Sequence, residues 1–339
     1  MWYDSALLRS AKFALCVLFL AALAFGCYRR PIPDDFDRYI YEAIVRGKSQ
    51  SIEVVYSIVK HESPRAEASS ILDSPQHLRE LEPMYAIRPV YLAAISVLSR
   101  VLPIQSAISF ISAAAWFGIG MVVLGWTKSP VLSGLLVAAF PILSLGRLGT
   151  PDALAALLVI CALWLLDREL PFALGLLFVS LGVRTDDILI LIAVLAWLAW
   201  EKKLPRLVAA ALAAAAIGIV LGINHWAGNY GWIVLFRFSF ISGRYPAEIP
   251  HVLTVREYVY GVARGAAALI DRVAVWLFVG CLAWRLRPNP LLIVVSGAVA
   301  AHFLLYPSPE DRYLVWAYVV AGVALVLSLD QEVERASAA

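Results

Sequence analysis

Charged residues are scarce in this sequence. Only 16% of its 339 residues are Asp, Glu, Lys or Arg, whereas about 25% is usual in a soluble globular protein. The basic residues form no Lys/Arg-rich run, and the formal net charge is only +3. Because proteins that bind nucleic acid carry a concentrated basic surface, we expect no nucleic-acid partner.

Cysteine is rare as well. Three of the four cysteines, Cys16, Cys161 and Cys281, fall inside apolar runs, where a thiol behaves as a small hydrophobic side chain. Cys27 stands alone at the end of the first apolar run. The sequence therefore predicts no disulfide framework.

Apolar residues dominate instead. They make up 61% of the chain, the mean hydropathy is +0.78, and apolar runs of helical length recur along the sequence. This pattern predicts an all-α, polytopic helical membrane protein. We expect about ten transmembrane helices from the length that a bilayer requires, at residues 7–26, 106–125, 131–145, 151–166, 171–183, 187–200, 207–226, 266–284, 291–306 and 313–329.

A long polar stretch separates the first two of these runs. We expect residues 27–105 to form an extracytoplasmic loop of juxtamembrane helices, at 37–46, 52–60 and 75–81. Residues 85–102 are apolar but contain Arg88, Pro89 and Arg100, which favours a helix lying in the interface. The predicted organisation is thus a first transmembrane helix (1–26), this loop (27–105), a membrane bundle (106–329) and a cytoplasmic tail (330–339).

The positions of basic residues predict the orientation, because cytoplasmic connectors are rich in Lys and Arg. Both termini are then cytoplasmic, and the first loop faces outward together with Arg147, Arg184 and Arg312. The connectors assigned to the inside contain Lys128, Arg168, Lys202, Lys203, Arg206, Arg285 and Arg287.

An acidic cluster follows the first apolar run. Asp34, Asp35 and Asp37 lie within four positions, and they could simply begin the helix expected at 37–46. However, one helix cap needs one residue, and neighbouring carboxylates repel each other. Clustered carboxylates typically hold a divalent cation or keep one member available as a general base, so we favour a functional role.

Three outward helix starts share one pattern, a hydroxyl residue followed by acidic residues. Capping and the helix dipole would account for Asp152, Asp186 and Glu310 there. The three starts are Thr150-Pro151-Asp152, Thr185-Asp186-Asp187 and Ser308-Pro309-Glu310-Asp311.

Arginines beside these starts need another explanation, because the positive end of a helix dipole disfavours a cation. Arg147, Arg184 and Arg312 each require an anion, which is a neighbouring carboxylate, a lipid headgroup, or a bound phosphate held by the guanidinium fork. All three alternatives stay open. The isolated His225 and His302 are expected to be ordinary interior side chains.

These motifs occur in an order that resembles the GT-C superfamily of glycosyltransferases, which includes protein O-mannosyltransferases and lipid A aminoarabinose transferases. The residues that carry the resemblance are Asp34-Asp35-Phe36-Asp37-Arg38-Tyr39, Pro151-Asp152-Ala153-Leu154, Arg184-Thr185-Asp186-Asp187 and Glu310-Asp311-Arg312-Tyr313-Leu314.

The resemblance implies an inverting sugar transfer from a polyprenyl-phosphate-linked donor, on the outer face of a plasma membrane or bacterial inner membrane. It implies Asp35 or Asp34 as the base that deprotonates the hydroxyl of a glycan, lipid or protein acceptor. Members differ in using a divalent cation; Mg²⁺ or Mn²⁺ would lie on Asp35 and Asp37. The substrate and phosphate would be held by Arg184, Arg312, Arg147, Arg88, Tyr39, Asp37, Asp152, Asp187 and Tyr313.

Two other functions remain open. A carrier or lipid flippase would hide ionisable groups within its spans or break its helices there, and Asp271-Arg272 is the charged pair that lies deepest in a predicted span. A catalytically inactive subunit of an envelope assembly could have the same fold.

Overall fold

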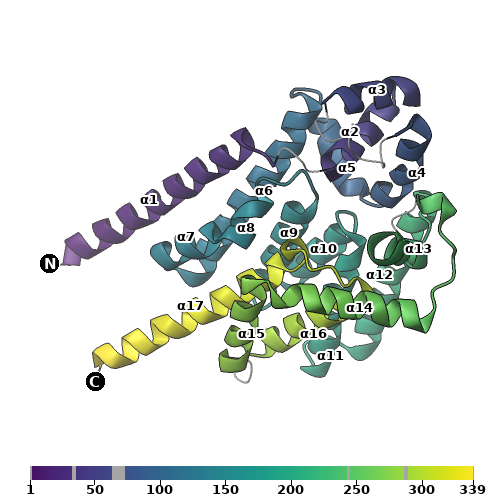
Figure 1. The fold of residues 1–339 in the computed structure, drawn as a ribbon. Coiled ribbons are helices and arrows are strands. Elements are labelled where there is room, and N and C mark those ends of the chain that lie inside the picture. Colours follow the sequence, from purple (N-terminus) through teal and green to yellow (C-terminus); the bar gives the residue numbers. More distant parts are fainter. Residues whose placement is uncertain (1, 33–35, 63–72, 243–244, 286–288, 339) are drawn as a thin grey trace.

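The computed structural model describes residues 2–32, 36–62, 73–242, 245–285 and 289–338. It is 81% helical, and no strand occurs in these ranges, which confirms the all-α prediction (Figure 1). Long apolar helices identify a membrane-embedded protein. Asp34 and Asp35, the predicted catalytic pair, lie outside the described residues.

Three described helices are long and apolar enough to cross a membrane. They are α1 (Trp2–Arg29) from Ser10 onward, α6 (Ile104–Thr127) and α12 (Arg206–Trp226). Several other apolar helices are shorter; α9 (Asp152–Leu165), for example, has 14 residues, which rise only about 21 Å along the axis. The ten predicted crossings therefore remain a prediction.

One predicted crossing is wrong as a single straight helix. Residues 266–284 divide between α14 (Val255–Ile270) and α15 (Val273–Arg285), whose axes meet at 89°. The break falls at the exposed Asp271-Arg272 pair, where a continuing apolar helix would have carried two charges into its interior.

The segment predicted at 131–145 is also interrupted. It forms α7 (Pro130–Ala138) and α8 (Phe140–Leu145), separated at Ala139, whose ψ of 139° is extended. Pro141 explains the break, because in a continuous helix its ring would clash with the carbonyl of Val137, four residues earlier, and its nitrogen could not donate a hydrogen bond to that carbonyl.

The described part of the first loop forms four helices. The predictions at 37–46 and 52–60 are confirmed by α2 (Phe36–Gly47) and α3 (Ile52–Glu62). The helix predicted at 85–102 is shorter than predicted, because α4 (Pro75–Ala86) continues to Ala86, the chain breaks around Arg88, and α5 covers only Pro89–Leu98. Pro89 starts the second helix and disfavours a helical conformation at Arg88, whose φ and ψ are −123° and 58°.

A small hydrophobic core joins these loop helices. Ile40, Val55, Leu78 and Leu81 are fully buried between α2, α3 and α4. The first turn of α2 is thereby held against α4, and Tyr85 and Arg88 follow directly at the end of α4. This packing presents the acidic start of α2 to the helix bundle.

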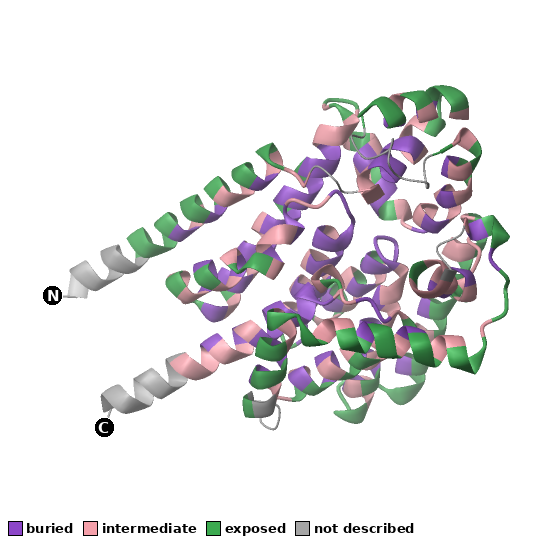
Figure 2. Ribbon diagram, viewed as in Figure 1, coloured by how far each residue is buried: buried purple, intermediate pink, exposed green. Residues whose placement is uncertain are grey.

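The main core belongs to the bundle. It is built by α6, α9, α10 (Leu170–Leu181), α11 (Ile188–Trp200), α16 (Pro290–Leu305) and α17 (Val315–Ala338). Buried residues concentrate on these central helices, whereas α1 and α12 are largely exposed (Figure 2). A broad exposed apolar surface is what lipid contact requires.

The two terminal helices extend from the same end of the molecule (Figure 1). The loop helices α2 to α5 lie at the other end, where α13 (Trp232–Arg237) also lies. The starts of α9, α11 and α17 point toward this second end, and so the helix-start motifs are brought together there.

Candidate functional site

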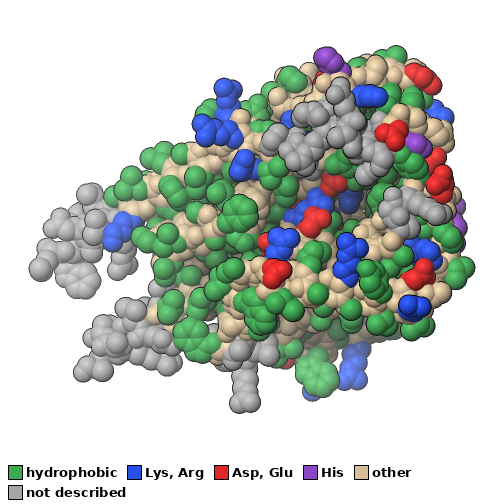
Figure 3. Space-filling view, in the orientation of Figure 1, with side chains coloured by type: hydrophobic (Ala, Val, Ile, Leu, Met, Phe, Trp, Pro, Cys, Tyr) green, Lys and Arg blue, Asp and Glu red, His purple; other side chains and the backbone are tan. Residues whose placement is uncertain are grey.

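Three arginines and several carboxylates from distant parts of the chain meet between the loop helices and the bundle. Figure 3 shows acidic and basic side chains gathered in a hollow on a largely hydrophobic face. The contributing segments are the start of α2, the α4–α5 junction, the start of α9, the turn Thr185–Asp187 before α11, and the turn Asp311–Tyr313 before α17.

Arg184 is the most deeply buried of the three arginines, with 5% of its surface exposed. Its Nη1 donates to Asp152 Oδ1 at 2.8 Å, and its Nε donates to Asp186 Oδ1 at 3.1 Å. The guanidinium also lies 4.9 Å from the centre of the Tyr313 ring. A buried cation needs a partner to offset its lost hydration. These contacts therefore explain how a charged Arg184 is stable beside the start of a helix.

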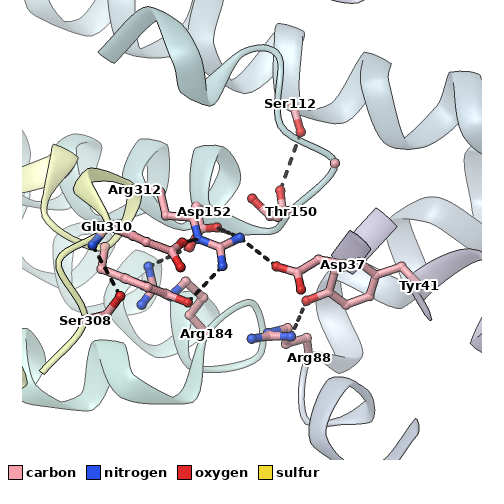
Figure 4. Close-up of polar contacts among 12 residues, drawn as sticks. Asp37, Tyr41, Arg88, Ser112, Thr150, Asp152, Arg184, Ser308, Glu310 and Arg312 are labelled. Atoms are coloured by element: carbon pink, nitrogen blue, oxygen red, sulfur yellow. Dashed lines mark hydrogen bonds and ion pairs between the residues drawn. The ribbon is translucent and has the colours of Figure 1, made fainter. Parts of the chain in front are cut away.

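Arg312 links the two ends of the sequence (Figure 4). Its Nη1 lies 2.6 Å from Asp37 Oδ2, on the first turn of α2, and its Nε lies 2.5 Å from Glu310 Oε2. Asp152 approaches the same guanidinium at 3.9 Å. Asp152 therefore contacts both Arg184 and Arg312.

Arg88 has different partners. Its Nη1 donates a hydrogen bond to the Tyr41 hydroxyl, and its guanidinium stands 5.4 Å from the centre of the Tyr41 ring and 5.3 Å from that of Tyr85. No carboxylate of a described residue lies within 4.0 Å of it. Within the described ranges, Arg88 is thus the site arginine without a direct carboxylate ion pair, although Asp37 and Asp152 lie near enough to stabilise its charge.

Electrostatics separate the carboxylates of the site. Burial raises the pKa of Asp37, but the Arg312 guanidinium and the Tyr85 hydroxyl, which donates to Asp37 Oδ1 at 2.6 Å, outweigh burial and hold the pKa below its usual value. Burial raises the pKa of Asp187 to about 8, even though Arg184 opposes the shift. Near neutral pH, Asp37 is ionised and Asp187 retains a proton.

A cavity of about 270 Å³ opens beside this network. Arg88, Arg184, Asp186 and His302 give it a charged end, and its other walls are mostly apolar, including Leu189 and Leu235. A cavity of this kind suits a ligand with an anionic group attached to an apolar chain.

The structure brings together most, though not all, of the predicted site residues. Arg88, Arg184, Arg312, Asp37, Asp152, Asp187 and Tyr313 form one interacting group. Tyr39 instead lies in the loop core, where its hydroxyl donates to Glu62 O at 3.4 Å. Arg147 lies beside the end of α1 and donates from Nε to Arg30 O at 2.9 Å.

Side-chain capping is absent at the first two of the three helix starts, whereas at the third Ser308 Oγ accepts a hydrogen bond from Glu310 N at 3.3 Å. The helix α9 has no side-chain cap, and Thr150 Oγ1 is buried without a hydrogen bond to any described residue. Asp152 and Asp186 pair with Arg184, while Glu310 pairs with Arg312. Ion pairing to a desolvated arginine outweighs the dipole effect, which contributes about 0.3–1 kcal/mol at exposed sites.

Three residues of the site were not singled out from sequence: Tyr41, Tyr85 and His302. His302 was expected to be an ordinary interior histidine, but its Nε2 lies 2.8 Å from Asp186 Oδ2 and it lines the cavity. No sequence pattern marks these three residues, because their neighbours come from other helices.

The predicted metal site stays a prediction. Among the described residues, no group of three or more His, Cys, Asp or Glu side chains is arranged to hold a metal ion. Asp35, one of the two predicted ligands, falls outside those ranges, and Asp37 is engaged by Arg312 and Tyr85.

Comparison with protein-family models, with curated proteins and with solved structures finds no match to this chain.

Proposed function

We propose that the protein is a membrane glycosyltransferase that moves a sugar from a polyprenyl-phosphate-linked donor to an acceptor hydroxyl. The observation that carries the proposal is the position of Arg88. This arginine lines an otherwise largely apolar cavity beside Arg184 and has no carboxylate partner among the described residues. A phosphate on a polyprenyl chain would supply both a direct anionic partner for Arg88 and an apolar body for the rest of the cavity.

In this proposal Arg88 and Arg184 hold the donor phosphate. The acceptor oxygen attacks the anomeric carbon, the bond from that carbon to the phosphate oxygen breaks, and the phosphate takes the electron pair. Guanidinium groups already in place stabilise this charge without reorganising. The sugar is transferred with inversion because attack and departure occur on opposite faces.

The acceptor proton goes to Asp35 or Asp34. Asp35 is two residues from Asp37, so covalent geometry keeps their Cα atoms within about 7 Å of each other. Arg312 holds Asp37 in the site, and this ion pair would keep the whole acidic motif near the anomeric carbon. A divalent cation, Mg²⁺ or Mn²⁺, is part of the proposal only as an ion that Asp35 and Asp37 would coordinate.

The proposed topology has about ten crossings, the site on the extracytoplasmic side, and both termini in the cytoplasm. The membrane would be a plasma membrane or bacterial inner membrane. The short helices α9 to α11 and α16 would cross with little tilt or in a locally thinned bilayer.

The proposal is tested by release of polyprenyl phosphate from a panel of polyprenyl-phosphate hexoses, with membrane glycans, lipids and proteins as acceptors. Wild-type protein should release it, and Asp35→Asn should reduce release by at least about a hundredfold if it is the general base. Asp34→Asn is the matched neighbour. If both single variants and the double variant turn over normally, the acidic motif has no catalytic role.

The bent helix pair favours a second candidate, a lipid flippase. Discontinuous helices are common in carriers, and α14 and α15 meet at 89°. Flipping of a fluorescent polyprenyl phosphate in proteoliposomes, without any release of phosphate from donors, would support the flippase. Binding without turnover or flipping would support an inactive subunit.

A further inference from the structure

His302 is placed to exchange a proton with whatever occupies the charged end of the cavity. It lies in the last turn of α16, with 7% of its surface exposed, and its Nε2 is 2.8 Å from Asp186 Oδ2. Asp186 is also held by Arg184. The three side chains form a continuous chain from the cavity wall into the network.

The contact with Asp186 defines the state of the imidazole. Burial raises the pKa of Asp186, but Arg184 and His302 outweigh burial and hold it well below its usual range, so the carboxylate is ionised. An ionised carboxylate only accepts, and therefore Nε2 carries a hydrogen. The other ring nitrogen, Nδ1, makes no hydrogen bond within the described part of the chain, and His302 lines the cavity.

The charged and titratable groups around His302 come from every neighbouring element. Asp186 and Arg184 lie on the turn before α11. The centre of the Tyr313 ring, from the turn before α17, is 5.8 Å from that of His302, and the centre of the Tyr306 ring, from the residue just after α16, is 6.4 Å away. Arg88 faces the same cavity from the α4–α5 junction. The ionised carboxylate of this set, Asp186, contacts Nε2, and the arginines and phenols line the same cavity as the ring.

We propose that His302 takes up a proton on Nδ1 when the cavity holds a phosphate monoester, and so distinguishes the doubly charged monoester from a singly charged phosphodiester. The inference rests on the proposed function, in which the donor is a phosphodiester and the lipid product is a monoester. Imidazole is suited to this role because it changes charge near neutral pH. The proton comes from solvent, and the imidazolium Nδ1–H donates to a phosphate oxygen.

The proposal predicts how affinity depends on pH. The probes are farnesyl phosphate, a monoester, and its methyl ester, a diester, measured by calorimetry in detergent. Between pH 7.5 and 8.5 the monoester is already a dianion. If its binding requires the protein to take up one proton, the affinity should fall by up to about tenfold for each unit that the pH rises. Affinity for the methyl ester should change little over the same range.

Buffers with different ionisation enthalpies report the proton directly. Wild-type protein should take up protons on binding farnesyl phosphate, and His302→Gln should lose most of this uptake and of the pH slope. His61→Gln is the control, because His61 is exposed on α3. A measurement on the unmutated protein avoids any folding defect of the His302→Gln variant. The protein has five histidines, and ¹⁵N spectra should show one imidazole becoming doubly protonated when farnesyl phosphate is added.

The outcomes separate the inference from the function. If farnesyl phosphate binds but uptake and slope are the same in wild type and His302→Gln, or no histidine signal changes, His302 has no such role and the lipid-phosphate cavity stands. If neither probe binds the wild-type protein, both the inference and the proposed donor site are overturned.

Discussion

The Asp37–Arg312 pair provides a strong quantitative test, because it joins the first loop to the last helix. The two atoms lie 2.6 Å apart, and the side chains are 20% and 17% exposed. At an effective dielectric constant of about 20, unit charges centred about 4 Å apart attract by roughly 4 kcal/mol, from which desolvation must be subtracted. We expect a coupling energy of about 1.5–3 kcal/mol in a double-mutant cycle.

The cycle consists of Asp37→Asn, Arg312→Gln and the double variant, measured by equilibrium unfolding in mixed micelles at neutral pH. Arg312→Gln should be the more damaging single change, because it leaves Asp37, Asp152 and Glu310 facing each other. After Asp37→Asn, Arg312 still contacts the other two carboxylates. The double variant should therefore lose less stability than the two single losses combined.

A matched control is available on the opposite end of the bundle. Lys203 and Asp167 also lie 2.6 Å apart, but their side chains are 43% and 74% exposed. The coupling of this exposed pair should be at most about 1 kcal/mol and should fall with added salt. A coupling for Asp37 and Arg312 no larger than that of the control would refute the buried network.

Further predictions concern acid titration and close packing. The pKa of Asp187 is raised to about 8, so the folded state keeps a proton that the unfolded state releases near pH 4. The free energy of unfolding should therefore fall by about 1.4 kcal/mol per pH unit as pH rises from about 4 to about 8. Asp187→Asn should remove this slope in thermal unfolding. The Asp37 contribution has the opposite sign, since its pKa is lowered, and the stability difference from Asp37→Asn should shrink as pH falls below about 4. Gly149→Ala should destabilise the folded protein by about 1–3 kcal/mol, because a Cβ there would lie 2.5 Å from Arg38 Cβ. Gly218→Ala is the control: a Cβ there would have no neighbouring atom within 4 Å, and this change should be neutral or stabilising in the same assay.

Much of the fold could be predicted from sequence, because an apolar run of this length in a membrane must satisfy its backbone hydrogen bonds internally, and a helix does so. The starts of α2, α9 and α16 fall within a residue or two of the predicted positions. The breaks were missed where they depend on local competition. Pro141 and the Asp271-Arg272 pair each interrupt a run whose average hydropathy gives no warning.

The site was predicted less completely, for a physical reason. The sequence placed acids and arginines at helix starts, but it could not show which of them meet. Asp37 and Arg312 are 275 positions apart, and Asp152 and Arg184 are 32 apart. Capping was the local explanation for Asp152. In the structure Asp152 instead forms an ion pair with Arg184, which exists only after α9 and α10 pack together.

The central claim concerns where a lipid-linked phosphate binds. The most direct measurement is its position in an experimental structure of the protein with bound polyprenyl phosphate. We expect phosphate oxygens within hydrogen-bond distance of both Arg88 and Arg184, with the polyprenyl chain along the apolar walls near Leu189 and Leu235. A phosphate bound elsewhere, for example beside Arg147 at the end of α1, would contradict the proposed donor site.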